Sequence, residues 1–312
     1  MISIIIATKN RPDHLKRCIR SIGKNSYKNF EVIIADQSSD EKTKRLIKTY
    51  NNQKIKYIQL SNSGKTKAVN QAIRFSRGEI LSFIDDDNIV NPDWLQVINA
   101  YFSKNPKIDG VFGKILPYKP SARANRICPS VFLLQKPAIV TDPYVIHHQS
   151  LGLGSNMSLK KQMLDRIGYF MEWLGPGNFG FCGGEDGELI HRMLLNRAVL
   201  AYDPRACVYH NRWLSYNDHR ALQAGYTGGE IAYSFYYWLK GDRKMSSVVD
   251  QLIHQRIGAS GLRGAMKKLN LNIFFRELKY ILWETLSILK GITVALIVFT
   301  MSHKKEINAL NT

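Results

Sequence analysis

Residues 79–87 read Glu-Ile-Leu-Ser-Phe-Ile-Asp-Asp-Asp, a short apolar run that ends in three adjacent carboxylates. Brevity and apolar character are typical of a strand that is buried on both faces of a sheet. Alternation along an extended chain points Asp85 and Asp87 to the same side, so both side chains can reach one ligand. Because neighbouring carboxylates repel one another, a hard divalent cation is a natural partner for them. A solvated acidic turn is the alternative, since Asp is common in turns.

Three more apolar runs precede this strand, and helical patterns separate them. The runs are Ile2–Ala7, Glu31–Ala35 and Ile55–Leu60, and the helices are predicted to begin near Pro12 and to cover residues 41–50 and Lys65–Ser76. The order βαβαβαβ predicts an α/β fold with a mostly parallel, doubly wound sheet. Ligands of such sheets bind beyond the carboxyl ends of the strands. The residues that follow strands at this edge are Thr8, Asn10, Asp36 and Asp85–Asp87.

The chain beyond residue 105 is less regular. Residues 106–143 are rich in proline, which predicts loops and short edge strands. Gly152–Leu159 predicts a strand that leads into the site, and the glycine-rich stretch Leu174–Gly187 predicts a mobile loop. Further on, the pattern predicts a helix over Glu185–Asn196, short strands over Val199–Tyr202 and Cys207–Tyr209, and a helix over Ala221–Leu239.

Composition excludes several classes of protein. The 312 residues are 45% hydrophobic and 22% charged, which excludes wholesale disorder and fibrous repeats. The 44 Lys and Arg against 25 Asp and Glu give a net charge of +19, which favours nucleic acid, anionic lipid or a phosphorylated substrate as a partner. The four cysteines form no Cys-x-x-Cys pair, so no zinc knuckle or disulfide framework is indicated. The N-terminus does not have the pattern of a signal peptide, and we expect a reducing, cytoplasmic setting.

A second acidic motif is Gly183-Gly184-Glu185-Asp186, at the end of the glycine-rich stretch. A carboxylate there can reach an acceptor hydroxyl and act as a general base. Helix capping is the alternative, because acidic residues at the start of a helix are favoured by its dipole.

The lysines around Gly64 and the isolated His210 are further candidates. The stretch Ser63–Lys67 contains Gly-Lys-Thr, but Gln59 stands where a phosphate-binding P-loop needs its first glycine. A helix that begins with lysines can still bind a diphosphate, or its lysines can simply be solvated. His210 is either a metal ligand or a structural histidine.

The C-terminal region has an amphipathic part and an apolar part. Residues 273–290 place charged and apolar side chains on opposite arcs of a helix, and Gly291–Met301 is apolar all round. Tyr280–Ser302 is long enough to span a bilayer, but it contains Glu284 and Lys290. An interfacial membrane anchor is favoured, and a single span or a packed helix remain alternatives.

Seven segments of the chain together resemble the family-2 glycosyltransferases of the GT-A fold. The segments are residues 3–11 (first strand and loop), 31–36 (second strand with its Asp), 62–72, 83–95 (the D-x-D segment), 154–170, 183–192 (the Glu-Asp motif) and 202–210. They occur in the family's order across roughly residues 1–212. The sequence departs from the usual pattern at Gln37–Asp40, after the second strand, and at Lys67, where arginine is usual.

The resemblance implies an inverting enzyme that moves a sugar from a nucleotide-diphosphate sugar to a hydroxyl group of a cell-surface or lipid-linked glycan. Mn²⁺ or Mg²⁺ is the implied cofactor, bound by Asp87 with His210 completing its shell. Asp186 is the implied general base. The other implied donor-site residues are Thr8, Asn10, Asp36 (for the base), Lys67 (for the phosphates), Asp85 and Asp86, and Asn156 and Glu185 are expected on the acceptor side.

Three regions are expected. Residues 1–214 form the GT-A catalytic domain, with a nucleotide-sugar half over about 1–115 and an acceptor half over about 116–214. Residues 215–270 form a helical extension, and residues 271–312 form a membrane-associated tail on the cytoplasmic face of an anionic membrane, with a single C-terminal span as the alternative. Two rival functions remain: a sugar-phosphate nucleotidyltransferase, and a basic nucleic-acid-binding protein, although no nucleic-acid-recognition motif is present.

Overall fold

A computed structural model describes residues 1–50, 52–61, 64–123, 125–257 and 271–310. The chain divides into two compact units. The sheet unit comprises Met1–Glu172 and Leu189–Ser215, and the helical unit comprises Trp173–Glu188 and Tyr216–Thr312.

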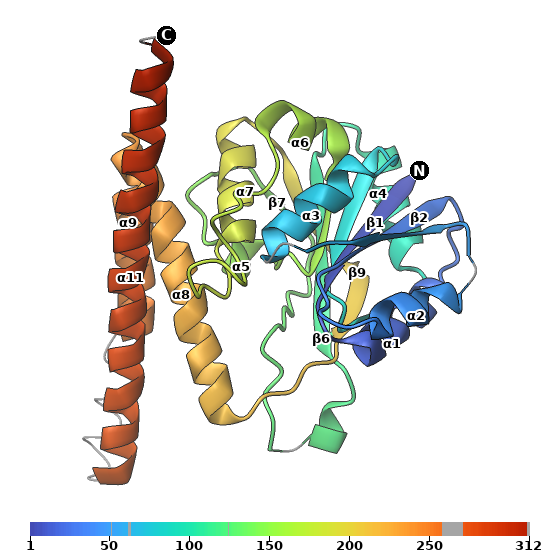
Figure 1. The fold of residues 1–312 in the computed structure, drawn as a ribbon, viewed down its shortest axis with the longest axis horizontal. Coiled ribbons are helices and arrows are strands. Elements are labelled where there is room, and N and C mark those ends of the chain that lie inside the picture. The colour runs from blue at the N-terminus through green and yellow to red at the C-terminus, as the bar shows by residue number, and fades with distance from the viewer. Residues whose placement is uncertain (51, 62–63, 124, 258–270, 311–312) are drawn as a thin grey trace. The chain divides into compact units, whose positions relative to one another are not determined.

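The sheet unit is built on one mixed sheet of nine strands (Figure 1). The strand order is β3-β2-β1-β4-β8-β6-β9-β5, and β7 pairs with β9 off this path. The four strands β3, β2, β1 and β4 are parallel, β8 runs against both of its neighbours, and β6 is parallel to β9. The strands are β1 (Ile2–Thr8), β2 (Phe30–Asp36), β3 (Ile55–Gln59), β4 (Ile80–Ile84), β5 (Asn88–Val90), β6 (Gly110–Pro117), β7 (Ala138–Val140), β8 (Asn156–Lys160) and β9 (Leu200–His210).

Helices cover both faces of the parallel half of this sheet. Chain order turns back at β1, because β2 and β3 lie on one side of it and β4 lies on the other. Right-handed crossovers then require α1 and α2 on one face and α3 on the opposite face, which is the arrangement in Figure 1. The helices of this unit are α1 (Pro12–Ile22), α2 (Lys42–Lys48), α3 (Lys65–Arg74), α4 (Trp94–Lys104), α5 (His147–Ser150) and α6 (Lys161–Ile167), with a 3-10 turn at Pro120–Arg123.

The predicted α/β fold is confirmed, and its elements form for the expected reasons. Strand β1 is an almost wholly buried apolar run, so it lies at the centre of the core. Helix α1 starts with Pro12 in its first turn and buries Leu15, Cys18, Ile19 and Ile22 at helical spacing. The reversal point between β1 and β4 therefore brings the two central carboxyl ends side by side.

Two expectations for the second half of the sheet are wrong. Strand β6 is not a short edge strand: it runs for eight residues between β8 and β9, and its proline, Pro117, stands at its end. The two short strands expected on either side of Pro204 are one strand, β9. Gly113 pairs with Asp203 and Lys114 with Cys207, so residues 204–206 bulge out of the ladder. Pro204 lies in this bulge, outside the ladder, so the N–H that proline lacks is not needed for strand pairing.

The helical unit contains α8 (Tyr216–Leu239), α9 (Met245–Ile257), α11 (Leu271–Leu310) and the first turn of α7 (Glu185–Leu195). The amphipathic and apolar segments expected near the C-terminus form one continuous helix, α11, which packs against α8. Among the described residues, Leu278–Lys304 of α11 is the one helical stretch long and apolar enough to cross a membrane, and 28% of its most apolar window is buried.

Candidate functional site

The acidic triplet lies at the carboxyl edge of the sheet, where the strand order reverses. Thr8 ends β1, Asp36 ends β2, and Asp85 follows β4 directly. In open α/β sheets this reversal point is where ligands bind. The fold thus places the predicted donor-site residues Thr8, Asp36 and Asp85 on adjacent strand ends.

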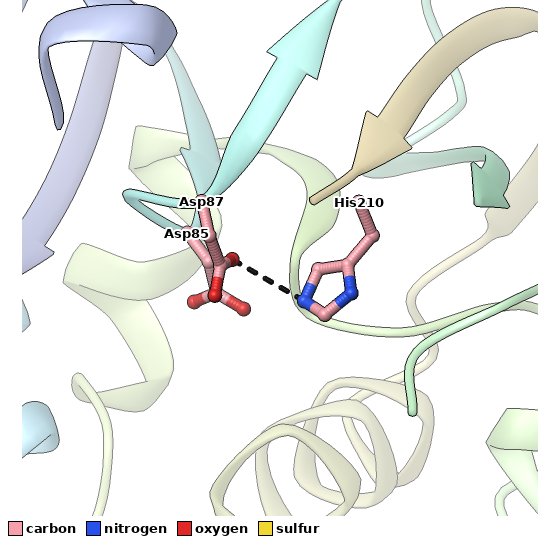
Figure 2. Close-up of side chains that lie close together, drawn as sticks. All are labelled: Asp85, Asp87 and His210. Carbon is pink, nitrogen blue, oxygen red and sulfur yellow. Dashed lines mark ion pairs between the residues drawn. The ribbon is translucent and has the colours of Figure 1, made fainter. Parts of the chain in front are cut away.

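Asp85, Asp87 and His210 form a cluster that could hold a metal ion. One ligand atom from each of the three side chains lies within 4.8 Å of the other two. Figure 2 shows His210, at the end of β9, facing the two carboxylates that follow β4. The short strand β5 makes this approach possible, because Asn88 pairs with His210 and the backbone N–H of Asn211 donates to the Asp87 carbonyl (2.9 Å).

The three carboxylates have different partners. Asp85 pairs with Lys65 Nζ (2.8 Å) and is partly exposed. Asp86 accepts hydrogen bonds from Thr8 (2.7 Å) and Arg11 (2.5 Å). Asp87 pairs with the other guanidinium nitrogen of Arg11 (2.8 Å). Arg11 therefore bridges two buried carboxylates.

The pKa values of the two buried carboxylates, Asp86 and Asp87, are shifted in opposite directions. Burial, with the nearby charges of Asp87 and Asp85, outweighs the pull of Arg11 and Thr8 and raises the pKa of Asp86 to about 7. Burial by itself also raises the pKa of Asp87, but the neighbouring His210 and Arg11 outweigh burial and hold that pKa well below its ordinary value. Asp87 is therefore the carboxylate of this buried pair that stays charged.

His210 is held from both of its ring nitrogens. Nε2 lies 3.2 Å from Asp87 Oδ1, and Nδ1 lies 3.3 Å from Cys128 Sγ. Burial alone lowers the pKa of His210, but the contacts with Asp87 and Cys128 outweigh it and raise the pKa to about 10.

The chemistry of this cluster fits a divalent cation. Asp87 Oδ1 is buried and accepts no hydrogen bond within the described residues, although it lies opposite His210. Two carboxylates and an imidazole are ligands that a divalent metal accepts together. A bound cation would also compensate the buried negative charge that Arg11 now balances.

The other predicted donor-site residues lie around this edge. Asp36 is buried and accepts hydrogen bonds from the Ser38 N–H (2.8 Å) and the Tyr57 hydroxyl (2.8 Å). Asn10, at a φ of 56°, accepts from the Ser39 N–H (2.9 Å) and so joins the loop after β1 to the loop after β2. These contacts fix the two loops in relation to each other.

Lys67 lies in the first turn of α3 and is half-buried, and its phosphate contact stays a prediction. Lys65, two residues earlier, is the lysine of this turn that pairs with Asp85.

Asn156 occupies a structural position. Its side chain accepts from Trp94 Nε1 (2.9 Å) and donates to the carbonyls of Lys114 (3.0 Å) and Ala206 (2.8 Å). It thus joins β8 to β6 and β9 beneath the site, and its expected contact with an acceptor stays a prediction.

Glu185 and Asp186 belong to the helical unit and stand in the first turn of α7. This position agrees with the helix predicted there. Their catalytic roles stay predictions, because both residues belong to a different unit from the Asp85, Asp87 and His210 cluster.

Arg11, Lys65 and Cys128 are partners of the acidic cluster that the sequence does not identify as such, although Lys65 is one of the lysines considered as diphosphate ligands. The acidic triplet itself indicates that basic partners such as Arg11 and Lys65 must exist, because buried carboxylates require cationic partners. Cys128 offers no such signal, since its neighbour His210 is 82 residues away along the chain.

Comparison with known proteins agrees with this fold. The family model described as "Glycosyl transferase family 2" matches residues 3–167. The Staphylococcus aureus poly(ribitol-phosphate) β-N-acetylglucosaminyltransferase TarS is 26% identical over 161 residues, which cover 48% of this chain and 28% of TarS. The chain spans between 28% and 40% of the length of the first curated relatives that it matches.

Two solved structures share the fold. TarS residues 1–349 in complex with UDP-GlcNAc align with a TM-score of 0.55 at 17% identity, covering 97% of this chain and 92% of that one. The mannosyltransferase PcManGT of Pyrobaculum calidifontis, in complex with GDP-Man and Mn²⁺, aligns with a TM-score of 0.58 at 15% identity, covering 96% and 86%.

The fold is that of the GT-A glycosyltransferases. Since the family model covers more than half of its length, the chain belongs to glycosyl transferase family 2.

Proposed function

We propose that this chain transfers a sugar, with inversion, from a nucleotide-diphosphate sugar to a hydroxyl group of a cell-surface or lipid-linked glycan. The observation that carries the proposal is the cluster of Asp85, Asp87 and His210 at the strand-order reversal of a family 2 chain. The binding of UDP-GlcNAc by one structural neighbour, and of GDP-Man with Mn²⁺ by the other, supports a nucleotide-sugar donor and a metal.

On the donor side, Asp87 and His210 would hold Mn²⁺ or Mg²⁺, with Asp85 beside it. The chemistry that the cation supplies when bound is compensation of the negative charge on the leaving diphosphate. Thr8, Asn10 and Asp36 would bind the nucleoside, and Asp86 would hold Arg11 and Thr8 in place for it. The basic first turn of α3, with Lys65 and Lys67, would lie near the phosphates.

On the acceptor side, Asp186 would act as the general base. The acceptor oxygen attacks the anomeric carbon and forms the new glycosidic bond, while the bond from that carbon to the diphosphate oxygen breaks. The hydroxyl proton moves to the Asp186 carboxylate, and the nucleoside diphosphate leaves on the opposite face. Glu185 and Asn156 would support the acceptor side.

The experiment is to incubate the purified chain with Mn²⁺ or Mg²⁺ and a panel of UDP- and GDP-sugars, and to measure the release of nucleoside diphosphate. We expect one donor to be hydrolysed slowly without acceptor and turned over faster with a glycan extract. Release of pyrophosphate from a nucleoside triphosphate would instead indicate a nucleotidyltransferase. Salt-sensitive retention on DNA without donor turnover would indicate a nucleic-acid-binding protein.

The Asp186→Asn variant tests the catalytic step. We expect a fall in kcat of about 100- to 10,000-fold, the usual contribution of a general base, with donor binding retained. The control is Asp250→Asn, which changes an exposed carboxylate of α9 in the same unit. Turnover by Asp186→Asn at the rate of the unaltered chain would show that Asp186 is not the base.

We also propose that α11 attaches the chain to an anionic membrane on its cytoplasmic face. Seven large apolar residues between Leu278 and Met301, a part of α11 whose side chains the structure describes, are exposed. They follow one another at steps of mostly three, four or seven positions and so form one stripe along the helix. They are Leu278, Leu282, Leu286, Leu289, Leu296, Ile297 and Met301. An apolar stripe on a chain of net charge +19 suits an anionic lipid surface.

A further inference from the structure

Helix α8 presents three glycines, Gly225, Gly228 and Gly229, within one and a half turns of its interior. Glycine weakens a helix relative to alanine, so its repeated use there indicates that another part of the chain must come very close. The surroundings of each glycine in the helical unit identify that part.

The loop before α7 lies directly on this glycine face. A Cβ atom added to Gly229 would stand 2.1 Å from the carbonyl oxygen of Gly183, and one added to Gly225 would stand 2.5 Å from Cys182 Sγ. The Cys182 N–H donates to the Gly225 carbonyl (3.2 Å). The contact is therefore between backbones, which cannot yield as a flexible side chain can.

The same contact seen from the loop is equally close. Gly184 has a φ of +95°, and a Cβ added to it would stand 2.6 Å from the carbonyl carbon and oxygen of Gly229. Neither glycine can accept a side chain without moving the other segment. Gly184 is also the last residue before α7, and its carbonyl accepts the Glu188 N–H (3.0 Å).

A second contact holds the far side of the same turn. Glu188 is completely buried, and its carboxylate accepts a hydrogen bond from the hydroxyl of Tyr237 on α8 (2.7 Å). Asp186 stands between Gly184 and Glu188. Both ends of its turn are thus fixed to one helix, at Gly229 and Tyr237, about two turns apart along α8.

Helix α11 also packs against this glycine-bearing part of α8. A Cβ atom added to Gly291 would stand 2.5 Å from the carbonyl oxygen of Gly228. The loop and α11 therefore both approach the backbone of α8 at neighbouring glycines.

We propose that Gly229 and Tyr237 are positioning residues that hold the turn carrying Asp186 at a fixed place on α8. The proposal rests on the proposed function in taking Asp186 as the general base. A base must lie within hydrogen-bond reach of the proton that it removes, so a small displacement of its turn is costly. Gly229 and Tyr237 then affect the rate of transfer through the position of Asp186.

The test compares Gly229→Ala and Tyr237→Phe with the unaltered full-length chain. We expect kcat for transfer to fall by about 10- to 100-fold while the KM for the active donor stays nearly constant. The melting temperature should fall no further than in Gly113→Ala, where an added Cβ is equally crowded. Independently of activity, we expect faster amide hydrogen exchange in residues 182–188, since both changes loosen that turn. The matched controls are Gly23→Ala, whose added Cβ meets nothing closer than 3.7 Å, and Tyr50→Phe, which loses a hydrogen bond in the sheet unit.

Gly225→Ala is the milder variant should Gly229→Ala not fold, because its Cβ meets the Cys182 side chain. We expect Gly225→Ala alone to slow transfer, and the added change Cys182→Ala, which removes the Sγ atom, to restore part of the rate.

Unchanged kcat and unchanged exchange in Gly229→Ala and Tyr237→Phe would overturn the proposal. A loss of kcat that appears only together with weaker donor binding and a larger fall in melting temperature than that of Gly113→Ala would overturn it too, because that pattern is a general loss of structure. Full activity of Asp186→Asn would instead refute the base assignment in the proposed function, and the exchange result would still decide whether α8 holds the turn.

Discussion

Three consecutive carboxylates, Asp85, Asp86 and Asp87, share one turn of chain, and each has a different electrostatic environment. Asp85 is partly exposed and pairs with Lys65. Asp86 is buried among hydrogen-bond donors, yet its pKa is raised to about 7. Asp87 is buried between Arg11 and His210. Of the two buried carboxylates, Asp87 is therefore the one that stays charged, and it is the better placed of the two to bind a cation.

Replacing Asp87 tests this assignment. We expect Asp87→Asn to weaken Mn²⁺ binding at least about 10-fold, because it removes a charged ligand and leaves Arg11 and His210 facing each other. Isothermal titration calorimetry of Mn²⁺ into the chain measures this effect. Asp165→Asn, at an exposed carboxylate on α6, is the control and should bind as before. Equal Mn²⁺ affinity in the two variants would exclude Asp87 as a ligand.

Glu31 gives a pH-dependent prediction away from the metal cluster. Its buried carboxylate accepts hydrogen bonds from Ser3 (2.6 Å) and from the N–H (2.7 Å) and side chain (3.1 Å) of Arg77. Burial alone raises the pKa of Glu31, but these contacts outweigh burial and lower it below its ordinary value of 4.5. A lowered pKa in the folded state means that ionised Glu31 stabilises the fold above pH 4.5, and that this stabilisation is lost as the pH falls through the folded-state pKa.

We therefore expect Glu31→Gln to lower the free energy of unfolding at pH 7 by about 1 to 3 kcal/mol, the usual value of hydrogen bonds to a charged group. The difference from the unaltered chain should shrink as the pH is lowered below 4.5. Urea denaturation at a series of pH values measures it. A difference that stays constant over this range would show that ionisation of Glu31 contributes nothing.

At the scale of elements, local patterns predict the parallel half of the sheet well. Strands β1 to β4 and helices α1 to α3 follow from apolar runs, helical spacing and Pro12, all of which act within a few residues. Strands β6 and β9 do not follow in this way, since their pairing joins residues about 90 positions apart and is decided by packing. The bulge that accommodates Pro204 depends on this pairing and is invisible to local patterns.

The candidate site also contains residues that the sequence predicts and residues that it does not. The grouping of Asp85, Asp87 and His210 was predicted, and the three side chains do lie together. Arg11 and Lys65 were not assigned, because the need for cationic partners does not say which of 44 basic residues supplies them. That choice depends on where the loop after β1 and the start of α3 lie in the folded chain.

The β9 bulge offers an element-scale prediction. A Cβ atom on Gly113 would stand 1.9 Å from the Ala206 carbonyl oxygen and 2.4 Å from Asn156 Nδ2. We expect Gly113→Ala to destabilise the chain by about 1 to 3 kcal/mol through overpacking, measured by urea denaturation, and to weaken Mn²⁺ binding because His210 lies on the same strand. Gly23→Ala, with room for its Cβ, is the control. A Gly113→Ala variant as stable as this control would contradict the packing described for the bulge.

At the scale of the whole molecule, the proposed membrane contact depends on both the net charge and the exposed apolar stripe of α11. We expect the full chain to bind vesicles of phosphatidylcholine with phosphatidylglycerol more tightly than vesicles of phosphatidylcholine alone, and salt to weaken this binding. Changing the exposed residues Leu282, Leu286 and Leu289 to serine should reduce vesicle co-sedimentation several-fold, because it removes apolar surface that the proposed lipid contact would bury.

The matched control changes Leu133, Leu134 and Ile139 to serine, since these residues are also exposed but lie in the sheet unit. Equal co-sedimentation of the two triple variants would argue against a lipid contact through α11. It would leave α11 as a packing partner of α8.

The place of β8 between β4 and β6 has a consequence for biosynthesis. When the ribosome has finished β4, one edge of that strand has no partner, and β8 follows only about 70 residues later. At translation speeds of about 5 to 20 residues per second, the growing polypeptide carries this open edge for roughly 4 to 14 seconds. Open edges invite pairing with other chains, so this interval is when a chaperone would protect the nascent protein most.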